Sequence, residues 1–212
     1  MVNHQLRINI RALAELKKNG RKIGKLRFKS EGRFKTLNYN QSGFRLEGKN
    51  VILSKIGENP IKLHREVKGK IKGVLIKRES SGKWFAIFQV EEPSKLLAGT
   101  HKTIGIDVGL KYFLTDTDGR QIENPRFYRK SLERIRMEHK KLSRKKKGSK
   151  NRERQRIKLA KAYEKLVNQR EDFLHKLSRF YLNNYDIIAV EDLNIKGMVR
   201  HYRLASKILD AS

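Results

Sequence analysis

Two short apolar segments of the chain each end in a carboxylate. The first runs from Thr103 to Asp107, and the second runs from Tyr185 to Glu191. Short runs rich in β-branched residues predict strands that are buried on both faces. An acid at the end of such a strand is held rigidly and still reaches solvent. Two acids from neighbouring strands can hold Mg²⁺, which takes one or two carboxylates together with substrate phosphates. The pair therefore predicts a magnesium site suited to phosphodiester chemistry.

Each of these acids also has a simpler interpretation. Glycines at 105 and 109 flank Asp107 and would let a phosphate approach the backbone closely. Asp107 could equally end a strand or begin a turn. Beside Glu191, Asp192 or Asn194 could cap a following helix. Local sequence alone leaves both alternatives open.

The elements that would position the two acids follow from the residue periodicity. After the Asp107 strand we expect strands over 111–116 and 121–123 joined by a turn at 117–120, and then two long helices. A fourth strand ends at Glu191. This order is the beginning of a ribonuclease-H-like α/β sheet, in which the first and fourth strands are neighbours. The expected apolar helix faces consist of Leu132, Ile135, His139 and Leu142, and of Ile157, Ala160, Tyr163, Leu166, Val167, Phe173, Leu174, Leu177 and Phe180.

The first half of the chain has a different pattern. Residues 5–19 predict a helix, and residues 23–90 alternate with a period of two. The clearest hairpin has strands at 70–77 and from Trp84 to Val90, with a turn at 79–82. We expect Trp84 in the core, the alternative being an exposed ring that stacks on bases. The expected fold class is α+β: a helix over 1–22, an antiparallel β-barrel domain over 23–95, a linker at 93–99, and a partial α/β domain over 101–212 with a helical hairpin over 127–183.

The composition points to a polyanionic partner. The chain has 51 Lys and Arg against 22 Asp and Glu, a formal charge of +29. Binding of phosphates by such a surface releases counterions and is sensitive to salt. No apolar run approaches the length of about 18 residues needed to span a membrane, so no membrane partner is expected. Absence of cysteine excludes disulfides and thiolate zinc sites within this chain. We expect a cytoplasmic protein.

Much of the positive charge falls on the predicted helical hairpin. Residues 126–170 contain 19 Lys and Arg and only four Glu. A run of one sign and this density is expected to track phosphates rather than to be an ordinary solvated face, and it indicates no base-specific contact. The candidate nucleic-acid-binding residues are Arg126, Arg129, Lys130, Arg144, Lys145, Lys146, Lys147, Lys150, Arg152 and Arg156.

Several blocks of the sequence together resemble one protein family. They are Gly105–Lys111, Ile122–Phe127, Leu142–Asn151, Asn168–Leu177 and Val190–Met198, and they are similar to the TnpB (OrfB) proteins of insertion-sequence transposons. Two earlier blocks, Gly43–Leu46 and Val51–Gly57, resemble the β-barrel wedge domain of that family.

The resemblance implies an RNA-guided DNA endonuclease with a RuvC-like nuclease domain. Its partners would be DNA and a guide RNA, and the protein would hold the heteroduplex by shape and charge. Asp107 and Glu191 would be its first and second catalytic acids and would bind Mg²⁺. The family pattern continues past Asp210 with further sheet, a four-cysteine zinc ribbon and a third catalytic Asp. For this chain we therefore expect weak or lost Mg²⁺ binding, no zinc, and inefficient cleavage.

Three functional hypotheses remain. The first is the metal-dependent nuclease role that the resemblance implies, with Asp107 and Glu191 as catalytic and metal-binding residues. The second is a module that binds RNA or DNA without cutting it. The third is a decayed transposon fragment that has no activity.

Overall fold

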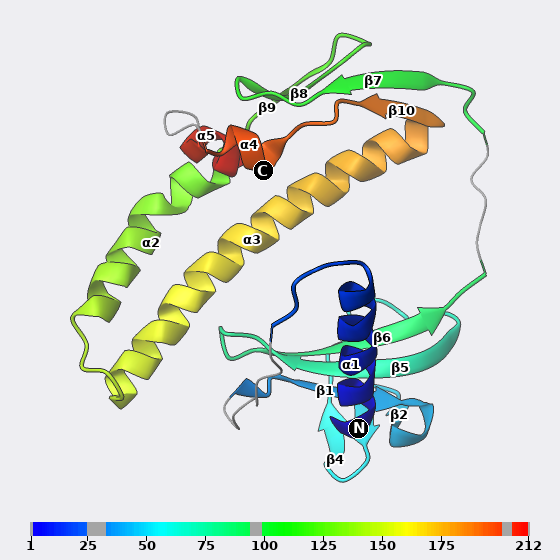
Figure 1. Ribbon diagram of the computed structural model, residues 1–212, viewed down its shortest axis with the longest axis vertical. Coiled ribbons are helices and arrows are strands. Elements are labelled where there is room, and N and C mark those ends of the chain that lie inside the picture. The colour runs from blue at the N-terminus through cyan, green and yellow to red at the C-terminus, as the bar shows by residue number, and fades with distance from the viewer. Residues whose placement is uncertain (1, 25–32, 94–98, 201–204, 212) are drawn as a thin grey trace. The chain divides into compact units, whose positions relative to one another are not determined.

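The computed structural model describes residues 2–24, 33–93, 99–200 and 205–211 (Figure 1). The chain divides into two compact units, Met1–Ser94 and Lys95–Ser212. Both units combine helices with antiparallel strand pairs, which confirms the α+β class. The expected linker at 93–99 lies largely outside the described residues.

Unit 1 begins with helix α1, Val2–Lys18. The helix predicted near the N-terminus is therefore confirmed. It stops because Gly20 adopts a left-handed φ of 70°, which lets the N–H groups of Gly20 and Arg21 donate to the carbonyls of Lys17 and Leu16. Several apolar side chains of α1, including Leu6 and Ile10, are exposed.

Unit 1 contains two antiparallel three-stranded sheets. The first has the order β1-β5-β6 and the second the order β2-β3-β4. The strands are β1 (Thr36–Asn40), β2 (Phe44–Glu47), β3 (Asn50–Leu53), β4 (Gly57–Pro60), β5 (Lys70–Arg78) and β6 (Trp84–Glu91), and a short 3-10 helix, η2 (Gln41–Gly43), joins β1 to β2. The predicted β5–β6 hairpin is confirmed, and Gly82 supplies the positive φ of 87° in its turn.

Both sheets of unit 1 contribute to one core. Tyr39 and Val74 from the first sheet cluster with Val51 and Leu53 from the second. The two sheets thus pack face to face, as alternating apolar residues dictate. Among the described residues the strand pairing leaves two separate sheets and no closed barrel.

The prediction for Trp84 is wrong. Its side chain is 59% exposed. Ala86 and Phe88 share its face of β6 and pack against the core, but Trp84 is the first residue of the strand and lies beyond that cluster. It pairs with Arg78, whose guanidinium carbon lies 5.7 Å from the Trp84 ring centroid. Alternation gave the correct face but could not show where the core ends.

Unit 2 is built on a four-stranded sheet with the order β10-β7-β8-β9. Strands β7 (Thr103–Asp107), β8 (Tyr112–Asp116) and β9 (Gln121–Glu123) form an antiparallel meander, and β10 (Ile187–Val190) pairs in parallel with β7. The predicted neighbour relation between the first and fourth strands of this unit is confirmed. Parallel pairing requires a long crossover, which the two helices between β9 and β10 provide.

Helices α2 (Phe127–Ser143) and α3 (Lys150–Asn184) form the hairpin between β9 and β10 (Figure 1). In their loop Gly148 has a φ of 83°, and the Ser149 hydroxyl accepts from the Arg152 N–H and caps α3. Their contact centres on four buried residues: Ile135, Leu159, Ala162 and Leu166. The second half of α3 covers one face of the sheet, where Tyr181 and Tyr185 join the core formed by the strands.

Two short helices follow β10: α4 (Ile195–Met198) and α5 (Ala205–Ala211). Ile208 of α5 is buried. None of the helices in the described ranges combines the length and apolar character needed to cross a membrane.

Candidate metal centre and nucleic-acid interface

Asp107 and Glu191 lie level with each other at the C-terminal ends of the neighbouring strands β7 and β10 of unit 2. In the parallel pair, Ile106 of β7 is the partner of Val190 of β10. Asp107 follows Ile106 and is the last residue of β7, while Glu191 follows Val190 directly after β10 ends. Because residues in register on parallel strands project to the same face, both carboxylates point to one side of the sheet.

That side of the sheet is the one that α3 does not cover. Ile104, Ile106 and Ile188 face α3 and join its core. Alternation therefore places Asp107 and Glu191 on the opposite face, and both are exposed. Neither carboxylate forms a hydrogen bond or ion pair with any residue that the structure describes.

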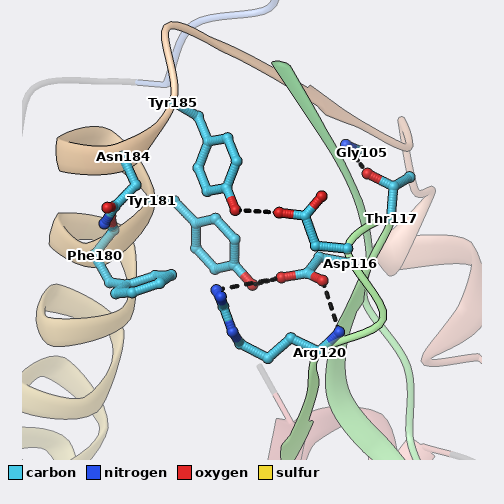
Figure 2. A network of polar contacts seen from close by, with 9 residues as sticks. Gly105, Asp116, Thr117, Arg120, Phe180, Tyr181, Asn184 and Tyr185 are labelled. Carbon is cyan, nitrogen blue, oxygen red and sulfur yellow. Dashed lines mark hydrogen bonds and ion pairs between the residues drawn. The ribbon is translucent and has the colours of Figure 1, made fainter. Parts of the chain in front are cut away.

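Small residues lie beside the two acids on the same face. Two positions before the carboxylates, Gly105 is the register partner of Ala189. A Cβ on Gly105 would come within 2.9 Å of Thr117 Cγ2, and the Gly105 N–H donates to Thr117 Oγ1 at 3.1 Å (Figure 2). Glycine at 105 is thus required by the close approach of the β8–β9 turn.

The two acids fit a magnesium ion as a pair of ligands. They are level and exposed, and neither has a competing partner in the part of the chain that the structure describes. Mg²⁺ needs only one or two carboxylates when water and phosphate supply the rest. Within the described part of the chain no cluster of three or more His, Cys, Asp or Glu side chains could hold a metal ion.

A polar network behind this edge connects the β8–β9 turn to the end of α3 (Figure 2). Asp116 is 5% exposed, and its carboxylate accepts from the Tyr181 hydroxyl at 2.8 Å and from the Arg120 N–H at 2.8 Å. Arg120 also forms an ion pair with Asp116, with Nη1 and Oδ2 3.5 Å apart, and its guanidinium lies over the Phe180 ring at 4.4 Å. The buried charge is therefore compensated by two neighbours.

The same network perturbs two tyrosines. Burial, followed by the hydrogen bond to Asp116, raises the pKa of Tyr181 to about 12. The hydrogen bond that the Tyr185 hydroxyl donates to Asp118, followed by burial, raises the pKa of Tyr185. Both tyrosines are neutral donors that attach α3 to the strands. Sequence reasoning missed this network, although an acid ending a strand and a tyrosine pair at the end of a helix were visible signals.

The candidate nucleic-acid-binding residues lie along the α2–α3 hairpin. Nine of the ten are exposed, and Arg152 is half-buried. Arg152 Nη1 donates to the carbonyls of Leu142 and Lys145, so this side chain closes the loop between the helices. Arg156 forms an ion pair with Glu153 at 2.5 Å. The lysines at 145–147 and 150 face solvent around the loop.

Asp210 has a role that sequence reasoning did not identify. Its carboxylate accepts from the Tyr128 N–H at 2.8 Å, in the first turn of α2. Arg126, at the N-cap position of α2, has a left-handed φ of 51° and gives the helix no side-chain cap. Asp210 thus caps a helix that begins 83 residues earlier in the chain.

Comparison with known proteins assigns the family. The family profile described as "Probable transposase", of the OrfB type, matches residues 87–201, which is more than half of the chain and includes both Asp107 and Glu191. The chain belongs to the TnpB/OrfB family. The matched region contains the whole sheet of unit 2 and the α2–α3 hairpin.

Two curated relatives align with a longer part of the chain than the family profile does. One, named "Putative RNA-guided DNA endonuclease", from Streptomyces pristinaespiralis, is 32% identical over 139 residues, covering 66% of this chain and 35% of the relative. The other, "Putative RNA-guided DNA endonuclease InsQ" from Escherichia coli, is 31% identical over 175 residues, covering 81% of this chain and 43% of the relative. The matches thus span less than half the length of either relative.

Proposed function

We propose that this chain contributes a nucleic-acid-binding, wedge-like unit and a RuvC-like nuclease unit to an RNA-guided DNA endonuclease. The observation that carries the proposal is the level placement of Asp107 and Glu191 at the ends of two neighbouring parallel strands. The sheet order supports a RuvC-like domain, and the two packed sheets of unit 1 support a barrel-related wedge. The names of the two relatives support the reaction.

Asp107 and Glu191 would hold Mg²⁺ through their carboxylate oxygens. Bound Mg²⁺ supplies an activated water and stabilises the charge on the leaving oxygen of the phosphodiester. The two strands hold the acids rigidly. On the same face Thr117 of the β8–β9 turn covers Gly105, whereas Ala189 presents only a methyl group. The Asp116–Tyr181 hydrogen bond keeps the opposite face closed against α3.

The α2–α3 hairpin would bind the phosphate backbone of the guide or of its heteroduplex with DNA. The support is its exposed positive charge, which is concentrated around the loop at 144–150. Such contacts position the nucleic acid and leave sequence recognition to base pairing with the guide.

Unit 1 offers a second kind of contact with nucleic acid. Trp84 is exposed beside Arg78, and its neighbour Phe85 is 43% exposed on the other face of β6. An exposed aromatic ring next to cationic side chains can stack on an unpaired base. We assign Trp84 this role toward single-stranded RNA or DNA.

Metal binding by the purified chain tests the nuclease proposal. Mn²⁺, which shares the preference of Mg²⁺ for oxygen ligands, is a suitable probe. Titration calorimetry should show binding that is lost or at least about tenfold weaker in Asp107→Asn and Glu191→Gln. Asp192→Asn is the matched control, because it removes the adjacent acid. Equal binding by all four proteins would contradict the assigned ligands.

A non-catalytic RNA- or DNA-binding module is the second candidate. It is favoured by the finding that, among the described residues, no group of three or more His, Cys, Asp or Glu side chains is placed to hold a metal ion. Salt-sensitive RNA binding together with no Mg²⁺- or Mn²⁺-dependent cleavage of DNA would select this candidate. Cleavage that disappears in Asp107→Asn would select the nuclease.

A further inference from the structure

Strand β10 positions Glu191, but its own side chains specify its register on β7 only weakly. It has four residues, Ile187–Val190, all of them apolar, and among the described strands it lies at the edge of the sheet beside β7. Ile188 packs against the core, whereas Ile187 is 62% and Val190 is 67% exposed. A register is strongly fixed only where a buried face selects it. Sliding β10 by one residue, so that Asp192 is level with Asp107, would put Ala189 in the place of Ile188 in the core and Glu191 in the place of the exposed Val190.

Such a slide would change the acid that faces Asp107. Glu191 and Asp192 are consecutive, so a shift of one residue would bring Asp192 level with Asp107. Because the face is set by the position in the ladder, Asp192 would then point to the open side of the sheet. The identity of the second acid therefore depends on the register of β10.

At the other end of the strand pair, the buried Tyr185 and the carboxylate that follows it hold the start of β10. Asp186, directly before β10, accepts from the Thr100 N–H and the Thr100 hydroxyl, each at 2.9 Å, and from the His101 N–H at 2.7 Å. The Asp186 N–H donates to the Lys102 carbonyl at 2.9 Å. These bonds tie the residue that precedes β10 to the segment that enters β7.

The donors are arranged to suit a carboxylate at this one position. His101 has a left-handed φ of 55°, and its N–H donates to the same Asp186 oxygen, Oδ2, that accepts from the Thr100 N–H. The hydrogen bonds from the Thr100 and then the His101 N–H lower the pKa of Asp186, so it remains ionised as an acceptor at neutral pH. A residue shifted by one position would bring Tyr185 or Ile187 there, and neither side chain can accept three such bonds.

We infer that Asp186 is a positioning residue that sets the register of β10 on β7 and so selects Glu191, rather than Asp192, to face Asp107. The choice between Glu191 and Asp192 matters only if the proposed metal site is correct, but the register itself can be measured without metal. Asp186 lies five residues, or about 16 Å of extended strand, before Glu191, so it acts without touching the ion.

Disulfide trapping reads the register directly, since the chain has no cysteine. Thr103 and Ile187 are register partners, and both are exposed. Neighbouring strands lie about 4.8 Å apart, within the range that a disulfide bridges. The variant Thr103→Cys with Ile187→Cys should oxidise to a disulfide almost completely. Adding Asp186→Ala should lower the yield at least about threefold, with Asp186→Asn intermediate because one oxygen remains.

Asp172→Ala is the matched control for the loss of an acid. Asp172 lies on the surface of α3 and forms an ion pair with Lys176, so its removal should leave the disulfide yield unchanged. Helix content measured by circular dichroism verifies that each variant is folded. A folded Asp186→Ala protein that cross-links as well as the parent would overturn the inference.

Metal binding gives the second readout. In Asp186→Ala the Mn²⁺ affinity should fall about tenfold, and Asp192→Asn should now weaken the remaining binding where it had no effect before. If Mn²⁺ binding by the Asp186→Ala protein still depends on Glu191 and not on Asp192, Asp186 does not select the acid that faces Asp107. If the parent protein binds no Mn²⁺ while the cross-link still depends on Asp186, the register role stands and the proposed metal site fails.

Discussion

The hydroxyl of Tyr181 on α3 donates to the buried carboxylate of Asp116 on β8 at 2.8 Å. This contact joins two elements that are 65 residues apart in the chain and lies on the face of the sheet opposite the candidate metal centre. Removing the hydroxyl in Tyr181→Phe leaves a buried charge with one neighbour fewer. We expect unit 2 to lose about 1–3 kcal/mol of unfolding free energy, measured by urea denaturation. Tyr163→Phe, which removes an exposed hydroxyl bonded to His139, should cost under about 0.5 kcal/mol.

The same tyrosine predicts how stability depends on pH. The pKa of Tyr181 is raised from 10.0 to about 12 in the folded protein. Its contribution to stability is therefore complete below pH 10 and is lost as the pH rises through the folded value, because the unfolded chain releases the proton first. Ultraviolet titration should show one tyrosine that ionises near pH 12 and is missing in Tyr181→Phe. An identical titration curve for the two proteins would contradict the assignment.

The loop between α2 and α3 should dominate the salt dependence of nucleic-acid binding. Replacing Lys145, Lys146 and Lys147 together by Ala removes three exposed charges. We expect the slope of log affinity against log salt to fall by about 2 to 3, and the affinity to fall equally for unrelated sequences. Filter binding to a structured RNA at several salt concentrations measures both. The triple Lys→Arg variant keeps the charge and should bind like the parent.

Trp84→Ala should separate nucleic-acid binding from stability in unit 1. Because the ring is 59% exposed, its loss should change the unfolding free energy little. Binding to single-stranded RNA should weaken by about 1–3 kcal/mol if a base stacks on the ring. Fluorescence quenching of this single tryptophan gives a direct signal in the parent protein. Full affinity in the Trp84→Ala protein would exclude the stacking role.

Asp210→Ala should destabilise the start of α2. The Tyr128 N–H loses its acceptor, which costs about 0.5–2 kcal/mol in comparable helix caps. Asp210→Asn keeps a carbonyl oxygen at the same place and should retain most of the stability. Hydrogen exchange of the Tyr128 amide, measured by NMR, should become faster in the Ala variant and remain slow in the Asn variant.

The strands that carry the candidate site were predictable because their residue types and the turn residues between them all favour strands at these positions. β-Branched runs ending in Asp107 and Glu191, with a turn at 117–120, gave the order of the strands and the neighbour relation of β7 and β10. The register could not be predicted in this way, because the four apolar residues of β10 fit several alignments. It depends on the hydrogen bonds of Asp186, which join positions 85 and 86 residues apart.

The contact face of α3 shows the same limit. The apolar pattern correctly included Leu166, Phe173 and Leu177 but also selected Val167, which is 47% exposed. Leu159 and Ala162 fill the interface with Ile135 instead, next to a buried Gln155 that donates to Glu138. Ala162 is small and Gln155 is polar, so neither contributes to an apolar pattern. The residues of α3 that contact α2 could therefore be identified only from the packing of the two helices.

The outer side of β10 has a consequence for the behaviour of the molecule in solution. Its backbone N–H and C=O groups on that side pair with no described strand, and exposed Ile187 and Val190 line the same edge. An uncovered edge of this kind recruits any extended polypeptide that can pair with it. Among the described strands, β10 is thus an apolar edge at which the sheet of unit 2 can accept a further strand.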